Sequence, residues 1–134
     1  MGLDAAAAGR LAEQMLADGE RLTAIWRHVV LQLLDDYESD RRRNGTPAAA
    51  SRFALEPTPT SSPQVDAALA ALAEHLSRRD GWTTPLWATD ARRYAREWWF
   101  VAPLRGIHAS ALQQSPSAFR RRGVFITADG LARV

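Results

Sequence analysis

The sequence contains neither cysteine nor lysine. The absence of cysteine excludes disulfides, thiolate nucleophiles and every cysteine-based zinc or iron–sulfur site. All 17 basic residues are therefore arginine, a composition typical of a GC-rich coding bias, so arginine abundance alone is weak support for phosphate binding. No apolar run approaches the ~20 residues needed to span a bilayer, and the first residues lack the basic region of a secretory signal. We expect a cytoplasmic protein without membrane contact.

The motifs of the common enzyme and metal-binding classes are also missing. The sequence has no glycine-rich phosphate loop and no Gly-x-Ser-x-Gly nucleophile motif. His28, His75 and His108 stand far apart, and none has a metal-ligand spacing. Asp36 and Asp40 share a helical face, but exposed helix ends routinely carry such pairs. We therefore predict a non-enzymatic protein that needs no cofactor and no metal.

The first part of the chain is mostly acidic and the remainder is mostly basic. Residues 1–40 hold eight carboxylates and three arginines, whereas residues 41–134 hold seven carboxylates and fourteen arginines. The net charge of the whole chain is only +2. This asymmetry suits pairing within the chain or with a protein partner at least as well as it suits nucleic acid, because a duplex would also meet the acidic part.

The length of 134 residues favours one domain with one core. Apolar residues at helical spacing, separated by glycine and proline, predict an all-α single domain, 1–134, of five or six helices. The N-terminal helices occupy 1–43, a long irregular loop occupies 44–62, and the C-terminal part occupies 63–134. We expect Phe53 and Leu55 to anchor the loop to the surface.

Three helices are predicted before residue 81. The first covers 4–18 and ends at Gly19 in a left-handed conformation. The second carries a broad apolar stripe from Leu22 to Tyr37, which predicts the central element of the fold. The third begins at Ser62, an N-cap followed by proline at the first helical position, and ends at Gly81.

The C-terminal part is predicted to contain shorter elements. A helix runs from Thr89 or Asp90 through Phe100, a fifth helix lies within 104–112, and a sixth runs from Ser115-Pro116 to Gly123. The following residues, 124–126, form a brief extended segment. One core is expected to contain Trp26, Val30, Leu33, Leu69, Leu72, Leu76, Trp98 and Phe119.

Two arginine clusters are the candidate binding residues. Three adjacent guanidiniums on one short helix fan over most of its circumference, so at least one must face solvent or a partner. Trp98 and Trp99 lie between the clusters and would suit stacking on bases. The alternative is that both clusters are solvated or internally paired and that the tryptophans belong to the core. The candidate residues are Arg92, Arg93 and Arg96 in the first cluster and Arg120, Arg121 and Arg122 in the second.

Several short motifs stand out within residues 62–127. They are Leu72-Ala73-Glu74-His75-Leu76, Pro85-Leu86-Trp87, Tyr94, Trp98-Trp99-Phe100, and Ser115-Pro116 with Phe119-Arg120-Arg121-Arg122-Gly123-Val124-Phe125. With these motifs, residues 62–127 resemble a family of small actinobacterial proteins. Members of that family are uncharacterised or described as helix-turn-helix-like, and similar proteins occur as the small partner of toxin-like nucleotidyltransferases. The resemblance implies an antitoxin-like or regulatory partner and supplies no catalytic residues.

The candidate binding residues and the resemblance together predict one of two functions. The favoured one is a partner-binding protein, the antitoxin of a bacterial toxin–antitoxin module, that neutralises a toxin by direct contact through arginine and aromatic side chains. The alternative is a DNA-binding transcriptional regulator in which residues 104–122 form two short helices and the arginine run meets phosphates.

Overall fold

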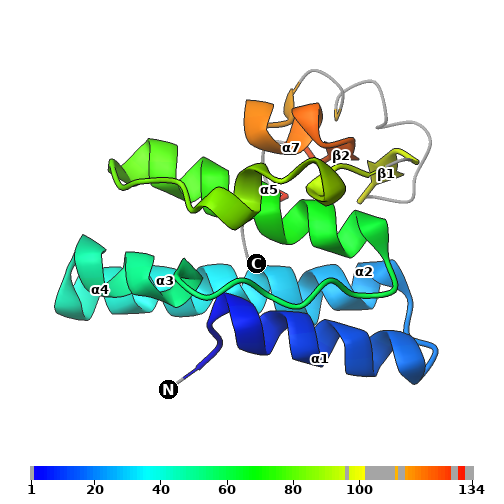
Figure 1. Cartoon of the computed structure of the whole chain (residues 1–134), viewed down its shortest axis with the longest axis horizontal. Helices are drawn as coiled ribbons and strands as arrows, with labels where there is room; N and C mark the ends of the chain where they lie inside the picture. Colours follow the sequence, from blue (N-terminus) through cyan, green and yellow to red (C-terminus); the bar gives the residue numbers. More distant parts are fainter. Residues whose placement is uncertain (1, 96, 102–110, 112–113, 128–129, 132–134) are drawn as a thin grey trace.

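Helices form most of the described chain (Figure 1). The computed structural model describes residues 2–95, 97–101, 111, 114–127 and 130–131. Two short strands are the only sheet among those residues, so the all-α expectation is confirmed. In chain order the elements are α1 (Ala5–Ala17), α2 (Leu22–Ile25), the π-helical η1 (Trp26–Val30), α3 (Leu31–Asn44), α4 (Thr46–Ala50), the 3-10 turn η2 (Ser51–Phe53), α5 (Pro63–Asp80), the 3-10 turns η3 (Leu86–Thr89) and η4 (Ala91–Arg93), β1 (Trp99–Phe100), α7 (Ser117–Arg121) and β2 (Val124–Phe125).

The central element is α5, and not the 22–37 helix that the sequence predicts. In Figure 1, α1 and α3 lie on one side of α5 while α7 and the strands lie on the other. Every residue from Val65 to Glu74 is buried, so α5 is covered on all sides. Five of these residues are fully buried alanines, whose small side chains let neighbouring elements approach closely; they are Ala67, Ala68, Ala70, Ala71 and Ala73.

The start and stop signals read from the sequence are confirmed for the long helices. The Ser62 hydroxyl accepts a hydrogen bond from the Val65 amide at 3.3 Å, which caps the first turn of α5. Gly81 ends α5 with φ +80°, and Gly19 follows α1 with φ +81°. Both φ values lie in the left-handed region that glycine adopts at low cost, so each helix stops where the sequence has glycine.

The predicted helix over 22–37 exists but is longer and irregular. The segments α2, η1 and α3 follow one another without a break from Leu22 to Asn44, with a π-helical stretch at Trp26–Val30. Ile25, Trp26, Val29 and Val30 are buried there. A π segment changes the angular spacing of successive side chains, so the apolar stripe predicted for a regular helix is only approximate at this point.

The expected irregular loop at 44–62 is partly helical. Helix α4 and the turn η2 occupy its first half, with proline at the second position of α4. Phe53 is fully buried and anchors the segment as predicted, whereas Leu55 is 69% exposed and does not. Alanine-rich sequence next to proline and threonine can form a short helix when it packs, as α4 does against α3.

The predicted helix from 89 to 100 is wrong. This stretch contains η4 and then β1, which pairs in parallel with β2 in the register Trp99 to Val124 and Phe100 to Phe125. Side chains alternate between faces along an extended chain, so Trp99 is buried while Trp98 is 65% exposed. Trp98 was expected in the core, and that expectation is also wrong. The remaining predicted core residues are buried.

The extended segment after Gly123 is confirmed as β2, and α7 is confirmed as a helix of five residues. The predicted fifth helix within 104–112 lies outside the described residues except for Ala111, which is buried. The strands and α7 therefore form a small C-terminal layer on α5 (Figure 1).

Candidate functional site

Two of the six candidate arginines are internal. Arg93 is 2% exposed and Arg122 is 1% exposed, so neither side chain is accessible to the predicted partner or nucleic acid, and the alternative of internal pairing applies to both. Arg93 donates hydrogen bonds to Glu56 and to the Pro57 carbonyl, and its guanidinium lies 5.2 Å from the centre of the Trp87 ring. A buried guanidinium needs partners for its charge, and Glu56 supplies one at 3.1 Å from Nη2. Nη1 makes no hydrogen bond among the described residues but lies 4.0 Å from Asp66 Oδ1.

Arg122 is held by both charge and backbone. Its Nη1 atom donates to Glu74 Oε1 at 2.6 Å and to the Ala118 carbonyl at 2.9 Å, and its Nη2 atom donates to the Ala88 carbonyl at 2.7 Å. The guanidinium also lies 5.1 Å from the centre of the Tyr94 ring. Arg122 thus joins α7, α5 and η3, and its function in the fold is structural.

Glu74 also pairs with two further arginines, Arg78 and Arg121. It is buried within α5, and its Oε2 atom accepts a hydrogen bond from Arg121 and forms an ion pair with Arg78 at 2.8 Å. Burial by itself raises the pKa of the Glu74 carboxyl, but hydrogen bonds and positive charge from Arg122 and Arg121 outweigh it and hold the pKa below its ordinary value. Glu74 is therefore an anion surrounded by three guanidiniums, which we call the Glu74 cluster: Glu74, Arg78, Arg121 and Arg122.

The other candidate arginines face solvent or lie outside the described residues. Arg120 is exposed, as the sequence argument required of at least one member of its run. Arg92 is also exposed and pairs locally with Asp90 at 2.9 Å, a contact that lowers the pKa of Asp90 to about 2. Arg96 lies outside the described residues. Within each predicted cluster, the described arginines thus divide between exposed and internal positions.

An aromatic surface lies beside the Arg122–Gly123 backbone. The Ala95 amide donates to the Arg122 carbonyl at 2.9 Å, and a Cβ at Gly123 would come within 3.3 Å of the Trp98 ring. Trp98 packs edge-on against Phe125 at 5.0 Å and near Phe100 at 6.4 Å between ring centres. We call this surface the Trp98 face: Trp98 and Phe100. Its tryptophan is fixed in position by packing yet remains mostly exposed.

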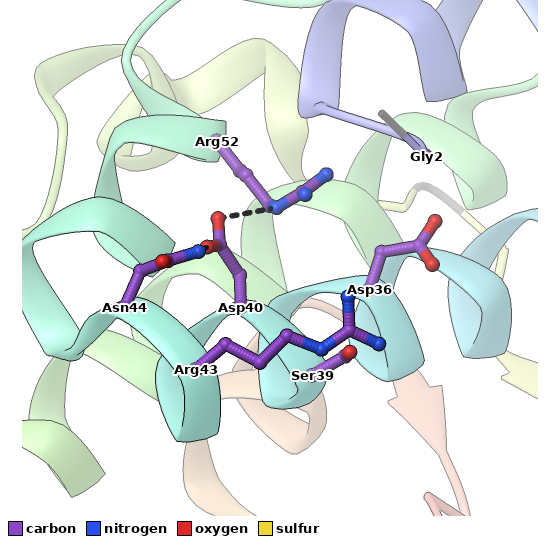
Figure 2. Close-up of a pocket in the computed structure, with 7 residues that line it drawn as sticks. All are labelled: Gly2, Asp36, Ser39, Asp40, Arg43, Asn44 and Arg52. Carbon is purple, nitrogen blue, oxygen red and sulfur yellow. Dashed lines mark hydrogen bonds and ion pairs between the residues drawn. The ribbon is translucent and has the colours of Figure 1, made fainter.

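A polar hollow of about 410 Å³ lies at the other end of the molecule, along α3 (Figure 2). Figure 2 shows Arg52 reaching Asp40, with a nitrogen–oxygen distance of 3.0 Å. Asp40 also accepts from Asn44, a contact that lowers its pKa, and Asp36 accepts from the Leu3 amide at 2.7 Å. Gly2, Ser39 and Arg43 complete the lining. These hydrogen bonds tie the first residues of the chain to α3, which gives the hollow a structural role.

The carboxylates and histidines do not assemble into a metal site where the structure shows them. Among the described residues, no group of three or more His, Asp or Glu side chains is placed to hold a metal ion. His28 is exposed, while His75 is half-buried and packs against Phe119 at 6.0 Å between ring centres. His108 lies outside the described residues. Within the same part of the chain, no helix combines the length and apolarity needed to cross a membrane.

Sequence reasoning missed Glu74 and Arg78 as members of the arginine site. A signal was present, because Glu74 and Arg78 are four residues apart on one helix, a spacing that favours an ion pair. The approach of Arg121 and Arg122 from α7, more than forty residues later, depends on tertiary packing and has no local signal.

Comparisons of this chain with protein-family models, with curated proteins and with solved structures gave no significant match.

Proposed function

We propose that this chain is a cytoplasmic, non-enzymatic partner-binding protein that contacts another protein through the Trp98 face. The observation that carries the proposal is the 65% exposure of Trp98, which lies over Gly123 and packs against the rings of Phe125 and Phe100. Tryptophan and tyrosine are enriched at the centres of protein interfaces, because they bury a large area with little loss of conformational freedom. A rigid, exposed tryptophan is suited to that use.

In this proposal, the exposed Arg120 is the polar residue at the edge of the Trp98 face. Arg120 is exposed three residues before Gly123, and its backbone carbonyl accepts from the Gly123 amide at 3.1 Å. An aromatic centre with arginine at its edge is the composition typical of interface hot spots. The antitoxin-like role implied by the resemblance of residues 62–127 makes a toxin the expected partner.

The structure gives less support to the DNA-binding alternative. Arg93 and Arg122 would have been phosphate contacts, and both are used inside the fold. Helix α7 has only five residues, and its buried members Ala118 and Phe119 pack inward. The part of the predicted helix pair at 104–110 lies outside the described residues.

A Trp98→Ala variant tests the proposal. Proteins from the native host that co-purify with the tagged wild type are identified by mass spectrometry, and the purified partner is titrated by calorimetry. We expect the variant to bind at least about tenfold more weakly, since interface tryptophans commonly contribute 2 kcal/mol or more. Leu11→Ala is the matched control, because Leu11 is 38% exposed on α1, on the far side of α5 (Figure 1).

Equal binding by wild type and Trp98→Ala would contradict the proposal. The salt dependence of binding distinguishes the protein interface from the DNA-binding alternative. A protein that makes six to ten phosphate contacts loses about 10³–10⁵ in affinity between 50 and 200 mM salt. An aromatic protein interface is expected to change far less over that range.

A further inference from the structure

The Glu74 cluster contains more positive than negative charge. Three guanidiniums surround one carboxylate, which leaves a formal local charge of +2. His75, next to Glu74, does not add to this charge at neutral pH, because burial and the nearby Arg79 lower its pKa. Like charges held together repel one another, so an anion that enters this place is favoured.

Two of the three guanidiniums are accessible. The side chains of Arg78 and Arg121 are 61% and 45% exposed, whereas those of Glu74 and Arg122 are 4% and 1% exposed. Nη2 of each accessible guanidinium is paired with the same oxygen, Glu74 Oε2, so these nitrogen atoms lie at most about 6 Å apart. Nη1 of each has no hydrogen-bond partner among the described residues.

We propose that Arg78 and Arg121 form a binding site for the phosphate group of a phosphate monoester. Such a group carries about −1.5 to −2 charges at pH 7 and three acceptor oxygens, which match the local charge and the free donors of two guanidiniums. A carboxylate or a phosphodiester carries one negative charge and would neutralise only half of the excess. This site is separate from the Trp98 face and does not depend on the proposed protein partner.

The fold should survive loss of the two accessible arginines. Arg122 remains bonded to Glu74 at 2.6 Å, so the buried carboxylate keeps a cationic partner when Arg78 and Arg121 are replaced. The double variant Arg78→Gln/Arg121→Gln therefore removes the site while retaining the internal ion pair. Arg10→Gln/Arg21→Gln is the matched control, because it removes the same charge from exposed positions on and after α1.

The experiment titrates each protein with inorganic phosphate and with glycerol 3-phosphate by calorimetry, at matched ionic strength in chloride. We expect both probes to bind the wild type and the control variant, and the Arg78→Gln/Arg121→Gln variant to bind at least about tenfold more weakly, since charge-assisted hydrogen bonds are lost. A thermal melt followed by circular dichroism verifies that all three proteins fold. Absence of binding to the wild type, or an equal loss in both variants, would overturn the proposal.

Two further probes identify the source of the phosphate. Dimethyl phosphate, a monoanion, is expected to bind more weakly than glycerol 3-phosphate, and tighter binding of the diester would contradict the charge argument. A phosphoserine peptide that binds at least tenfold more tightly than glycerol 3-phosphate assigns the site to a phosphorylated protein. Equal affinity of the two monoesters assigns it to a small molecule.

Discussion

Arg120 and Arg122 are two residues apart on the same short segment and have opposite environments. Arg120 is exposed, whereas Arg122 is 1% exposed and bonds to Glu74 and to two backbone carbonyls. We predict that Arg122→Ala lowers the free energy of unfolding by about 2–4 kcal/mol, because two buried carbonyls lose their donor and Glu74 loses its buried partner. Arg120→Ala should change it by no more than about 0.5 kcal/mol. Urea unfolding measures both, and equal effects would show that Arg122 is not an internal partner.

This contrast revises what the sequence predicts for the arginine run as a unit. Exposed arginines contribute little to stability, so replacing three exposed arginines by alanine would leave the fold nearly intact. With Arg122 inside, the triple variant is expected to lose stability through that one position. Single variants are therefore needed to separate folding from binding.

His75 gives the fold a pH dependence near neutrality. Burial, and then the positive charge of Arg79, lower its pKa below the ordinary 6.5. The unfolded state therefore binds the proton more readily, so the stability from neutral His75 is complete above pH 6.5 and falls as the pH drops below it. We predict a decreasing free energy of unfolding between about pH 7 and pH 5.5, with a smaller slope in His75→Gln.

Two carboxylates with lowered pKa values do not obscure this measurement. Burial raises the pKa of a third, Asp66, and its contribution is the same in the wild type and in His75→Gln, so the comparison removes it. The pKa values of Glu74 and Asp80 are lowered, so the stability they contribute is lost only as the pH falls below their ordinary values of 4.5 and 3.8. Urea titrations at pH 7, 6.5, 6 and 5.5 test the slope. An unchanged slope in His75→Gln would assign the dependence to another group.

At the scale of elements, α1 meets the segment before α5 through a glycine. A Cβ at Gly9 would lie 2.8 Å from Pro57 Cβ, which is closer than carbon atoms that are not bonded to each other normally approach. Alanine is a better helix former than glycine by about 1 kcal/mol, yet we predict that Gly9→Ala destabilises the protein by about 1–3 kcal/mol through this overlap. In the Pro57→Gly background the same substitution should become neutral or stabilising. A penalty that persists there would show that the overlap is not the cause.

The short C-terminal elements show where prediction from the sequence fails. Helices α1 and α5 carry caps, glycine stops and propensity within their own residues, and both were predicted with nearly correct ends. Strand β1 consists of two residues, and its partner β2 lies 25 positions later. A strand that short has no periodicity of its own, so tryptophans that would suit a helix are equally compatible with it.

At the scale of the whole molecule, α5 connects both layers. It packs against α1 and η1 on one side and against α7, η3 and β2 on the other. We therefore predict one cooperative unfolding transition, with coincident curves from far-ultraviolet circular dichroism and tryptophan fluorescence. Leu72→Ala, at a fully buried position, should shift both curves together and cost about 2–5 kcal/mol. Separate transitions would mean that the C-terminal layer folds independently.

Ion pairs between distant parts of the chain also belong to the scale of the whole molecule. The acidic N-terminal segment and the basic remainder pair within the fold, as Glu38 does with Arg79 and Asp40 does with Arg52 at 3.0 Å. Part of the segregation along the sequence is thus internal pairing, one of the alternatives that the charge pattern left open. The arginines that remain exposed are the ones available to ligands.

The sequence by itself determined the helical class, the ends of the long helices, the burial of Phe53 and most of the core. These features depend on residues within a few turns of one another, where capping and periodicity act. Only the tertiary structure decided that α5 is central, that Trp98 faces solvent, and that Arg122 and Arg93 are buried while Arg78 joins Arg121. Burial of a charge depends on which distant partner reaches it, and Glu74 and Arg122 meet across 48 positions of sequence, a contact that no local pattern encodes.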